Sequence, residues 1–177
     1  MKLKLIRTAW GIGGALRADA GRAVERLRAA GYHGLEASLD DIGATRKDRL
    51  AFVREARAQD FKLILSAYSS WPNYEGPFDA SSSSAAHVER LVRDFTEIAD
   101  LHASCTAGQP PTVIGVNAHS GTDMWLESEA VEFFTTINEQ VCAMGEGAMP
   151  RISHETHRGR VLTCPFVTAP LLKPLRP

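Results

Sequence analysis

The feature of this sequence that most constrains its fold is a repeated alternation between short apolar segments and longer amphipathic ones. The short segments have the length and aliphatic content of buried strands, and polar or glycine-rich sequence follows each of them. Alternation of this kind is typical of βα units around a parallel sheet. The sequence therefore predicts an α/β fold, with strands at 3–9, 33–38, 62–67, 112–118 and 151–155.

Helical segments separate the predicted strands. One is expected at about 19–30, and another after Thr45, whose hydroxyl can cap a helix together with Asp48 three residues on. A third should start in the serine run at 81–84, and a fourth after Ser128, each with apolar residues at helical spacing. Prolines near the end leave room only for a short helix starting at Pro165.

Five βα units are too few to close a (β/α)8 barrel. Such a barrel needs about 250 residues, or about 200 at the short end, and this sequence has 177. We therefore expect an open five-stranded α/β sheet or an incomplete barrel. A partial barrel exposes the inner faces of its strands, which we expect to be apolar, and this predicts low stability or self-association through the open edges.

Composition limits the class of protein. A content of 44% hydrophobic and 23% charged residues is that of one globular domain rather than a disordered chain. No apolar run approaches the roughly 20 residues of a membrane span, and the N-terminus lacks the apolar core of a signal peptide, so we expect a cytoplasmic protein without a membrane partner. The net charge of −1 makes nucleic acid an unlikely partner. The three cysteines form no CxxC pair, which argues against a disulfide framework or a thiolate zinc site.

Chemically capable side chains gather where the predicted strands end. In parallel βα folds the loops after the strands emerge on one face, where binding and catalytic groups collect. Glu36 ends the second predicted strand, and Trp10, Trp71 and Trp125 lie in the loops. The tryptophans are packing residues or, in the sharper interpretation, a wall on which sugar rings stack.

The ends of the fourth and fifth strands suggest a site. Side chains alternate along a strand, so Glu155 and His157 should face one side and His154 the other. Glu155 and His119 then lie at equivalent heights on neighbouring strands, within a few ångströms of each other. A carboxylate and a neutral imidazole can bind Mn²⁺, Zn²⁺, Co²⁺ or Fe²⁺, and the same pair can share a proton; both interpretations stay open.

A glycine run at 11–14 offers a nucleotide alternative. It follows the first strand, as a dinucleotide-binding loop does, but Leu16 stands at the third glycine position. The next helix is expected only near Asp19, which leaves no helix N-terminus for a pyrophosphate. The motif is therefore weak.

Three motifs together carry a resemblance to a known family. They are Gly34-Leu35-Glu36, Asn117-x-His119-Ser120-Gly121-x-Asp123 and His154-Glu155-Thr156-His157-Arg158-Gly159-Arg160. With these motifs in this order, the sequence resembles the xylose isomerase-like TIM-barrel superfamily. That superfamily holds sugar and sugar-phosphate isomerases and epimerases, inosose dehydratases and the endonuclease IV class. The resemblance spans almost the whole chain and implies a single domain, 1–177, that lacks the last three barrel strands.

The resemblance implies a sugar or sugar-phosphate isomerase or epimerase that transfers a proton through an enediolate. Glu155 would bind a divalent metal (Mn, Mg, Co or Zn) and act as the base, with His119 as a second catalytic residue. The family's other metal ligands come from strands six to eight, so metal binding is expected to be weak or absent and the activity impaired. The predicted substrate-binding residues are Trp10, Glu36, Trp71, His157, Arg158 and Arg160.

Two alternatives stay open. One is a non-catalytic fragment of such a barrel, which keeps the rim residues without the activity. The other, less favoured, is a DNA-repair protein similar to endonuclease IV; the single rim histidine on strand four, His119, and the near-neutral charge argue against it.

Overall fold

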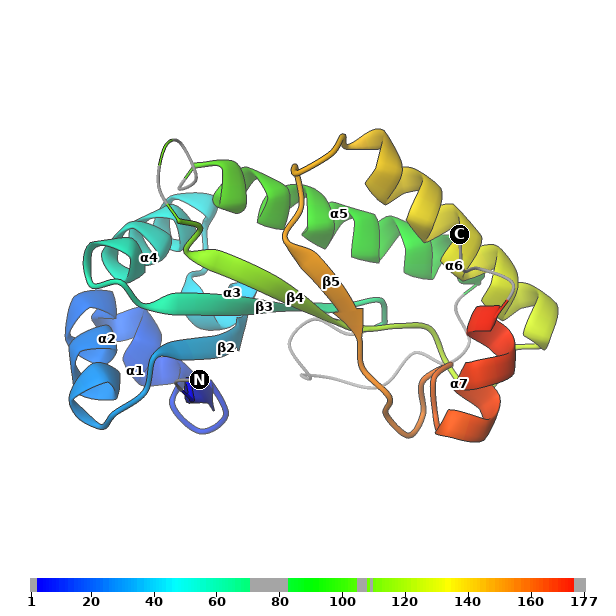
Figure 1. Ribbon diagram of the computed structural model, residues 1–177, viewed down its shortest axis with the longest axis horizontal. Coiled ribbons are helices and arrows are strands. Elements are labelled where there is room, and N and C mark those ends of the chain that lie inside the picture. The colour runs from blue at the N-terminus through cyan, green and yellow to red at the C-terminus, as the bar shows by residue number, and fades with distance from the viewer. Residues whose placement is uncertain (1–2, 71–82, 105–107, 109, 174–177) are drawn as a thin grey trace.

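Five parallel strands form one sheet whose order follows the chain (Figure 1). The structure is a computed structural model that describes residues 3–70, 83–104, 108 and 110–173. A sequential order of parallel strands, each followed by a helix, is the arrangement of consecutive βα units in a (β/α)8 barrel. The predicted fold class is confirmed. The strands are β1 (Ile6–Thr8), β2 (Gly34–Ser38), β3 (Lys62–Tyr68), β4 (Val113–His119) and β5 (Arg151–His154).

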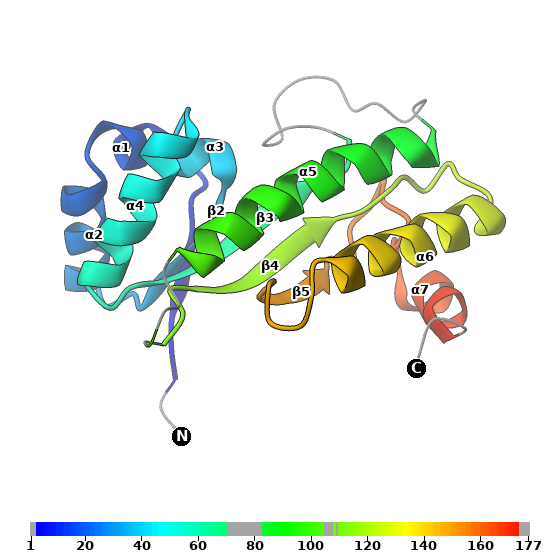
Figure 2. The ribbon, with the colours of Figure 1, turned by 90° about the horizontal axis from the view of Figure 1, so that it is seen from above.

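The long helices cover one face of this sheet. Each contacts the next in chain order, α2 with α4, α4 with α5 and α5 with α6, as Figure 2 shows from above. None of the helices in the described part of the chain has the length and apolar character needed to cross a membrane. These four helices are α2 (Ala20–Ala29), α4 (Arg46–Ala58), α5 (Ser84–Ala103) and α6 (Glu127–Ala143).

The two faces of the sheet differ in composition. On β3, Leu63 and Leu65 face the helices and are fully buried, whereas the alternate residues Ile64 and Ser66 face the open side. The pairing register aligns Ser66 with Asn117 on the open face. We expected apolar residues on an uncovered inner face. This is wrong for most of the described open-face positions, which carry Thr8, Glu36, Ser66, Asn117 and Ser153.

Two short helices were not predicted. Helix α1 (Gly13–Ala18) starts within the glycine run, and α3 (Leu39–Ile42) follows β2 directly. Ser38 and Asp41 cap α3 reciprocally, because the Ser38 hydroxyl accepts from the Asp41 N–H and the Asp41 carboxylate accepts from the Ser38 N–H. Both helices are too short to show helical periodicity in a sequence. The expectation that no helix begins before Asp19 is therefore wrong.

The ends of the longer helices mostly match the prediction. Thr45 and Asp48 form the expected capping box at the start of α4, and Ser83 caps α5. Helix α6 begins at Glu127, two residues before the position expected from a cap at Ser128. The last helix, α7 (Pro165–Leu172), has proline in its first turn as expected.

Candidate active site

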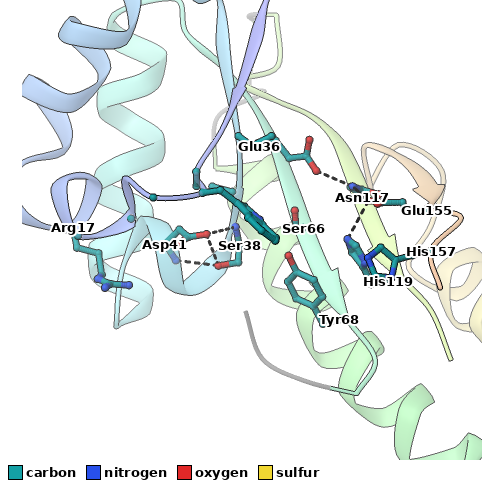
Figure 3. Close-up of a pocket in the computed structure, with 17 residues that line it drawn as sticks. Arg17, Glu36, Ser38, Asp41, Ser66, Tyr68, Asn117, His119, Glu155 and His157 are labelled. Atoms are coloured by element: carbon teal, nitrogen blue, oxygen red, sulfur yellow. Dashed lines mark hydrogen bonds and ion pairs between the residues drawn. The ribbon is translucent and has the colours of Figure 1, made fainter. Parts of the chain in front are cut away.

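A pocket of about 800 Å³ lies on the open side of the sheet, where β1 to β5 end (Figure 3). Side chains from all five strand ends reach it, so residues far apart in sequence share one wall. Four predicted site residues, in addition to Trp10, line this pocket. They are Glu36, His119, Glu155 and His157.

His119 and Glu155 meet as the sequence predicts. The Nε2 atom of His119 lies 3.1 Å from Oε2 of Glu155. The His119 side chain is 6% exposed, whereas that of Glu155 is 38% exposed. The histidine is therefore the buried member of the pair, and the carboxylate is the member that a ligand can reach.

Burial keeps His119 neutral at physiological pH. Loss of solvent lowers the pKa of His119 to about 4, and the charges of Arg160 and His157 act in the same direction, while Glu155 opposes them. A neutral imidazole that faces an ionised carboxylate must place its proton on Nε2, because two lone pairs would repel. His119 thus donates a hydrogen bond to Glu155.

One amide group joins two carboxylates in this pocket. Nδ2 of Asn117 donates to Oε1 of Glu36 at 2.7 Å and to Oε2 of Glu155 at 2.6 Å. Figure 3 shows Asn117 between the two glutamates, which come from β2 and from the end of β5. The motif 117–123 contained this residue, but we did not predict its contact with both acids.

Aromatic rings enclose the buried histidine. Tyr68 stacks on His119 with ring centroids 4.8 Å apart, and His157 packs edge-on at 5.7 Å. The backbone carbonyl of Arg158 accepts a hydrogen bond from Nδ1 of His157 at 2.7 Å, and this fixes the His157 ring. These contacts hold the imidazole of His119 in one orientation.

The opposite wall of the pocket comes from the two unpredicted helices. Arg17 of α1 and Asp41 of α3 line it, and Figure 3 shows both on the far side from His119. One guanidinium nitrogen of Arg17 donates to the backbone carbonyl of Asp40 at 3.1 Å. Among the described lining residues, Arg17 is the one with a permanent positive charge.

The remaining predicted site residues do not line the pocket. Arg158 is exposed beside it, and Trp71 lies outside the described residues. Arg160 is 1% exposed and buried, donating to the hydroxyl of Ser70 and to the carbonyl of Gly121 at 3.4 Å. The structure therefore gives Arg160 a different role from substrate contact: it ties the loop after β3 to the loop after β4.

His154 confirms the predicted alternation along β5. It points away from the pocket, packs edge-on against Phe134 of α6, and contacts the Ser120 hydroxyl through Nδ1 at 2.6 Å. Burial lowers the pKa of His154 to about 4. Glu155, the next residue, faces the open side with His119, as the period of two requires.

The described residues do not form a complete divalent-metal site. No three His, Cys, Asp or Glu side chains converge in this part of the chain. His119 and Glu155 supply two donors that already contact each other, and Glu36 is held by Asn117. A protein site for Zn²⁺ or Mn²⁺ needs three or more ligands, so this pair does not fit a tightly held metal.

Comparisons with known proteins do not identify a family for this chain. No family model matches the sequence, and no curated protein matches it. A crystal structure of a β-arabinopyranosidase is similar over 88% of this chain, with 16% sequence identity and a TM-score of 0.47. The chain spans 23% of that protein, and a similarity at this level carries no argument about function.

Proposed function

We propose that this pocket binds a sugar or sugar phosphate and catalyses its isomerisation or epimerisation by proton transfer. The observation that carries the proposal is the contact between the reachable carboxylate of Glu155 and the buried, neutral imidazole of His119. A carboxylate base beside a neutral imidazole donor suits the removal of a proton next to a carbonyl group.

Glu155 is the proposed base. Within the described residues, both polar contacts of its side chain fall on Oε2, from Asn117 and His119. Its Oε1 is therefore left to face a ligand and to take a proton from the carbon beside the ketose carbonyl. The two donors on Oε2 fix the direction of the carboxylate.

His119 is the proposed donor to the developing oxyanion. Its Nε2–H points at Glu155 without a ligand, and a bound carbonyl oxygen beside Glu155 can replace that acceptor. Hydrogen bonds in catalytic sites often take their final geometry only when substrate binds. A neutral imidazole stabilises the enediolate without adding a full positive charge beside the base.

The walls of the pocket favour a polyhydroxylated ligand. Trp10 is 72% exposed at the rim and offers a flat apolar surface for a sugar ring. Glu36 and Ser66 also line the pocket, with groups that hydrogen-bond hydroxyls. Arg17 supplies a cation at the far wall that suits a phosphate group.

A divalent metal is expected to bind weakly or not at all to the described residues. Among the residues that the structure describes, Mn²⁺, Mg²⁺, Co²⁺ or Zn²⁺ would find His119 and Glu155 as neighbouring ligands, which are too few for tight binding. We therefore assign the proposed proton transfer to side chains of this pocket. Self-association through the edge strands β1 and β5 is a further proposal, because in the described part of the chain each of them pairs on one side, and an open edge favours strand addition.

Conversion assays on ketoses test the proposal. The protein, with and without Mn²⁺, is incubated with a panel of ketoses and ketose phosphates, and products are followed by NMR. We expect conversion by the wild type and a loss of about 100-fold or more in Glu155→Gln, which removes the base. Glu139→Gln, an exposed position on α6, is the matched control.

Absence of conversion in the folded wild type would overturn the catalytic proposal and favour a non-catalytic barrel fragment. Cleavage of abasic DNA with added Zn²⁺, at a rate that Glu155→Gln lowers, would instead favour the endonuclease alternative.

A further inference from the structure

We propose that Glu36 is a second proton-transfer residue of this pocket and that Asn117 positions it relative to Glu155. The inference rests on the proposed function and makes it more specific. It assigns the pocket to epimerisation, in which a carbon loses a proton on one face and gains one on the other.

Asn117 brings the two carboxylates together. Its Nδ2 lies 2.7 Å from Oε1 of Glu36 and 2.6 Å from Oε2 of Glu155, and an amide has two N–H bonds, one for each acceptor. The two accepting oxygens are therefore no farther apart than the sum of these distances. A single side chain on β4 thus sets the separation of acids from β2 and from the end of β5.

Each acid keeps one oxygen for a ligand. In the described part of the chain, the side-chain contact of Glu36 is made through Oε1 and those of Glu155 through Oε2. Both side chains line the pocket and both are partly exposed. Oε2 of Glu36 and Oε1 of Glu155 are left for a carbon-bound proton. Figure 3 shows the two side chains reaching Asn117 from different strands.

The charges around Glu36 and Glu155 support a functional rather than a structural role for these two acids. No Lys or Arg side chain of the described residues forms an ion pair with Glu36 or Glu155. Two acids gathered around a neutral amide are less stable than the same acids paired with cations. Proteins keep such arrangements mainly where the acids bind or react.

The proton-transfer step balances with these two groups. One enters as a carboxylate and takes the proton from the carbon next to the ketose carbonyl, and the C–H electron pair moves into the enediolate. The other enters as a carboxylic acid and delivers its proton to the opposite face, while the carbonyl re-forms. The two groups have then exchanged protonation states, and proton exchange with water restores them.

Deuterium uptake tests the assignment. D-fructose and D-psicose, which are epimers at the carbon next to the carbonyl, are incubated with the protein in D₂O, both free and as 6-phosphates. Proton NMR reports conversion between the epimers and deuterium uptake without conversion. We expect Glu36→Gln to lower conversion about 100-fold or more, while uptake into one epimer stays within about 3-fold of wild type through Glu155.

The reciprocal variant completes the experiment. Glu155→Gln should lose conversion equally and keep uptake into the other epimer, through Glu36. Glu139→Gln should match the wild type. Glu36→Gln keeps an oxygen for the Asn117 amide, and Glu36→Ala, which also removes the acid, serves as a second variant if Glu36→Gln does not fold.

Three outcomes would overturn the assignment in different ways. If Glu36→Gln or Glu36→Ala converts the epimers at the wild-type rate, Glu36 transfers no proton. If Glu36→Gln loses uptake into both epimers equally, its role is structural. If the folded wild type shows neither uptake nor conversion, the proposed function itself fails and the assignment fails with it.

The positioning role of Asn117 has its own readout. Asn117→Ala should lower kcat for conversion by about 10–100-fold and reduce uptake into both epimers together, because both acids lose their common donor. KM should stay close to wild type. A loss that appears only as a higher KM or a smaller folded fraction would overturn the positioning role.

Discussion

The two faces of the sheet divide stability and chemistry between them. Toward the helices, β3 presents Leu63 and Leu65, which have no exposed surface. Toward the open side the same strand presents Ile64, Ser66 and Tyr68, of which the last two line the pocket. Neighbouring residues on one strand therefore have different tasks, because side chains alternate between the faces.

This comparison predicts that the faces respond differently to mutation. Truncating a side chain between sheet and helices leaves a cavity in a close-packed layer. Truncating Ile64 on the open face removes a side chain that is partly exposed and that no helix layer in the described part of the chain covers. Stability should depend on the first set, and activity on the second.

The largest expected effect on stability is that of Leu65→Ala. Leu65 is fully buried beneath the helices, and its truncation should lower the free energy of unfolding by about 2–5 kcal/mol. Ile64→Ala, at the next residue and on the opposite face, is the matched control and should lower it by about 1 kcal/mol or less. Urea denaturation of both variants measures the difference. Equal losses would mean that the open face is as tightly packed as the helical one.

Glu155→Gln should show the reverse pattern. Conversion of ketoses should fall about 100-fold or more, which corresponds to about 2.7 kcal/mol of transition-state stabilisation. The free energy of unfolding should change by less than about 1 kcal/mol, since Glu155 is partly exposed and the amide keeps an oxygen for Asn117. Kinetics and urea denaturation on the same preparation separate the two. A large stability loss would place Glu155 among the structural residues.

The sequence predicts the wall of the pocket formed by β4 and β5 better than the opposite wall formed by α1 and α3. Period-two alternation was sufficient to bring Glu155 and His119 together, because both lie at the ends of adjacent parallel strands. Arg17 and Asp41 were missed because the short helices α1 and α3 show no periodicity.

Two other features depend on three-dimensional geometry. The bridge from Asn117 requires the ends of β2 and β5 to approach within the reach of one amide, which no local pattern encodes. Arg160 is adjacent in sequence to the rim residues, yet Gly159 adopts a positive φ of 76° and the tight turn after His157 directs Arg160 inward.

Low pH should destabilise the protein through one buried histidine on each face of the sheet, His119 on the open face and His154 on the helical face. Burial lowers the pKa of His119 and of His154 to about 4, from about 6.5 when unfolded. The stabilisation that comes from keeping these histidines neutral is complete above pH 6.5. It is lost as the pH falls towards 4, because the unfolded chain binds protons at a higher pH than the folded protein does. Burial raises the pKa of Asp94 to about 6, which has the opposite sign and offsets part of the loss.

We expect a net loss of about 2 kcal/mol in the free energy of unfolding between pH 7 and pH 5. Urea denaturation across this range measures it. His154→Gln should remove about half of the histidine contribution, and so should His119→Gln, although the two lie on opposite faces. A slope that neither substitution changes would show that other groups cause the acid sensitivity.

The smallest expected effect is that of a divalent metal on the open face. His119 and Glu155 offer two donors, so a dissociation constant near 1 mM or weaker is the expectation for Mn²⁺, and 1 mM Mn²⁺ then stabilises the protein by about 0.4 kcal/mol or less. For a chain of this length that raises Tm by about 1 °C. Glu155→Gln should abolish the shift, and Glu139→Gln should keep it. A rise of about 5 °C or more that Glu155→Gln removes would require ligands beyond this pair. The open face would then bind a metal in addition to transferring protons, and the proton-transfer mechanism would have to include that ion.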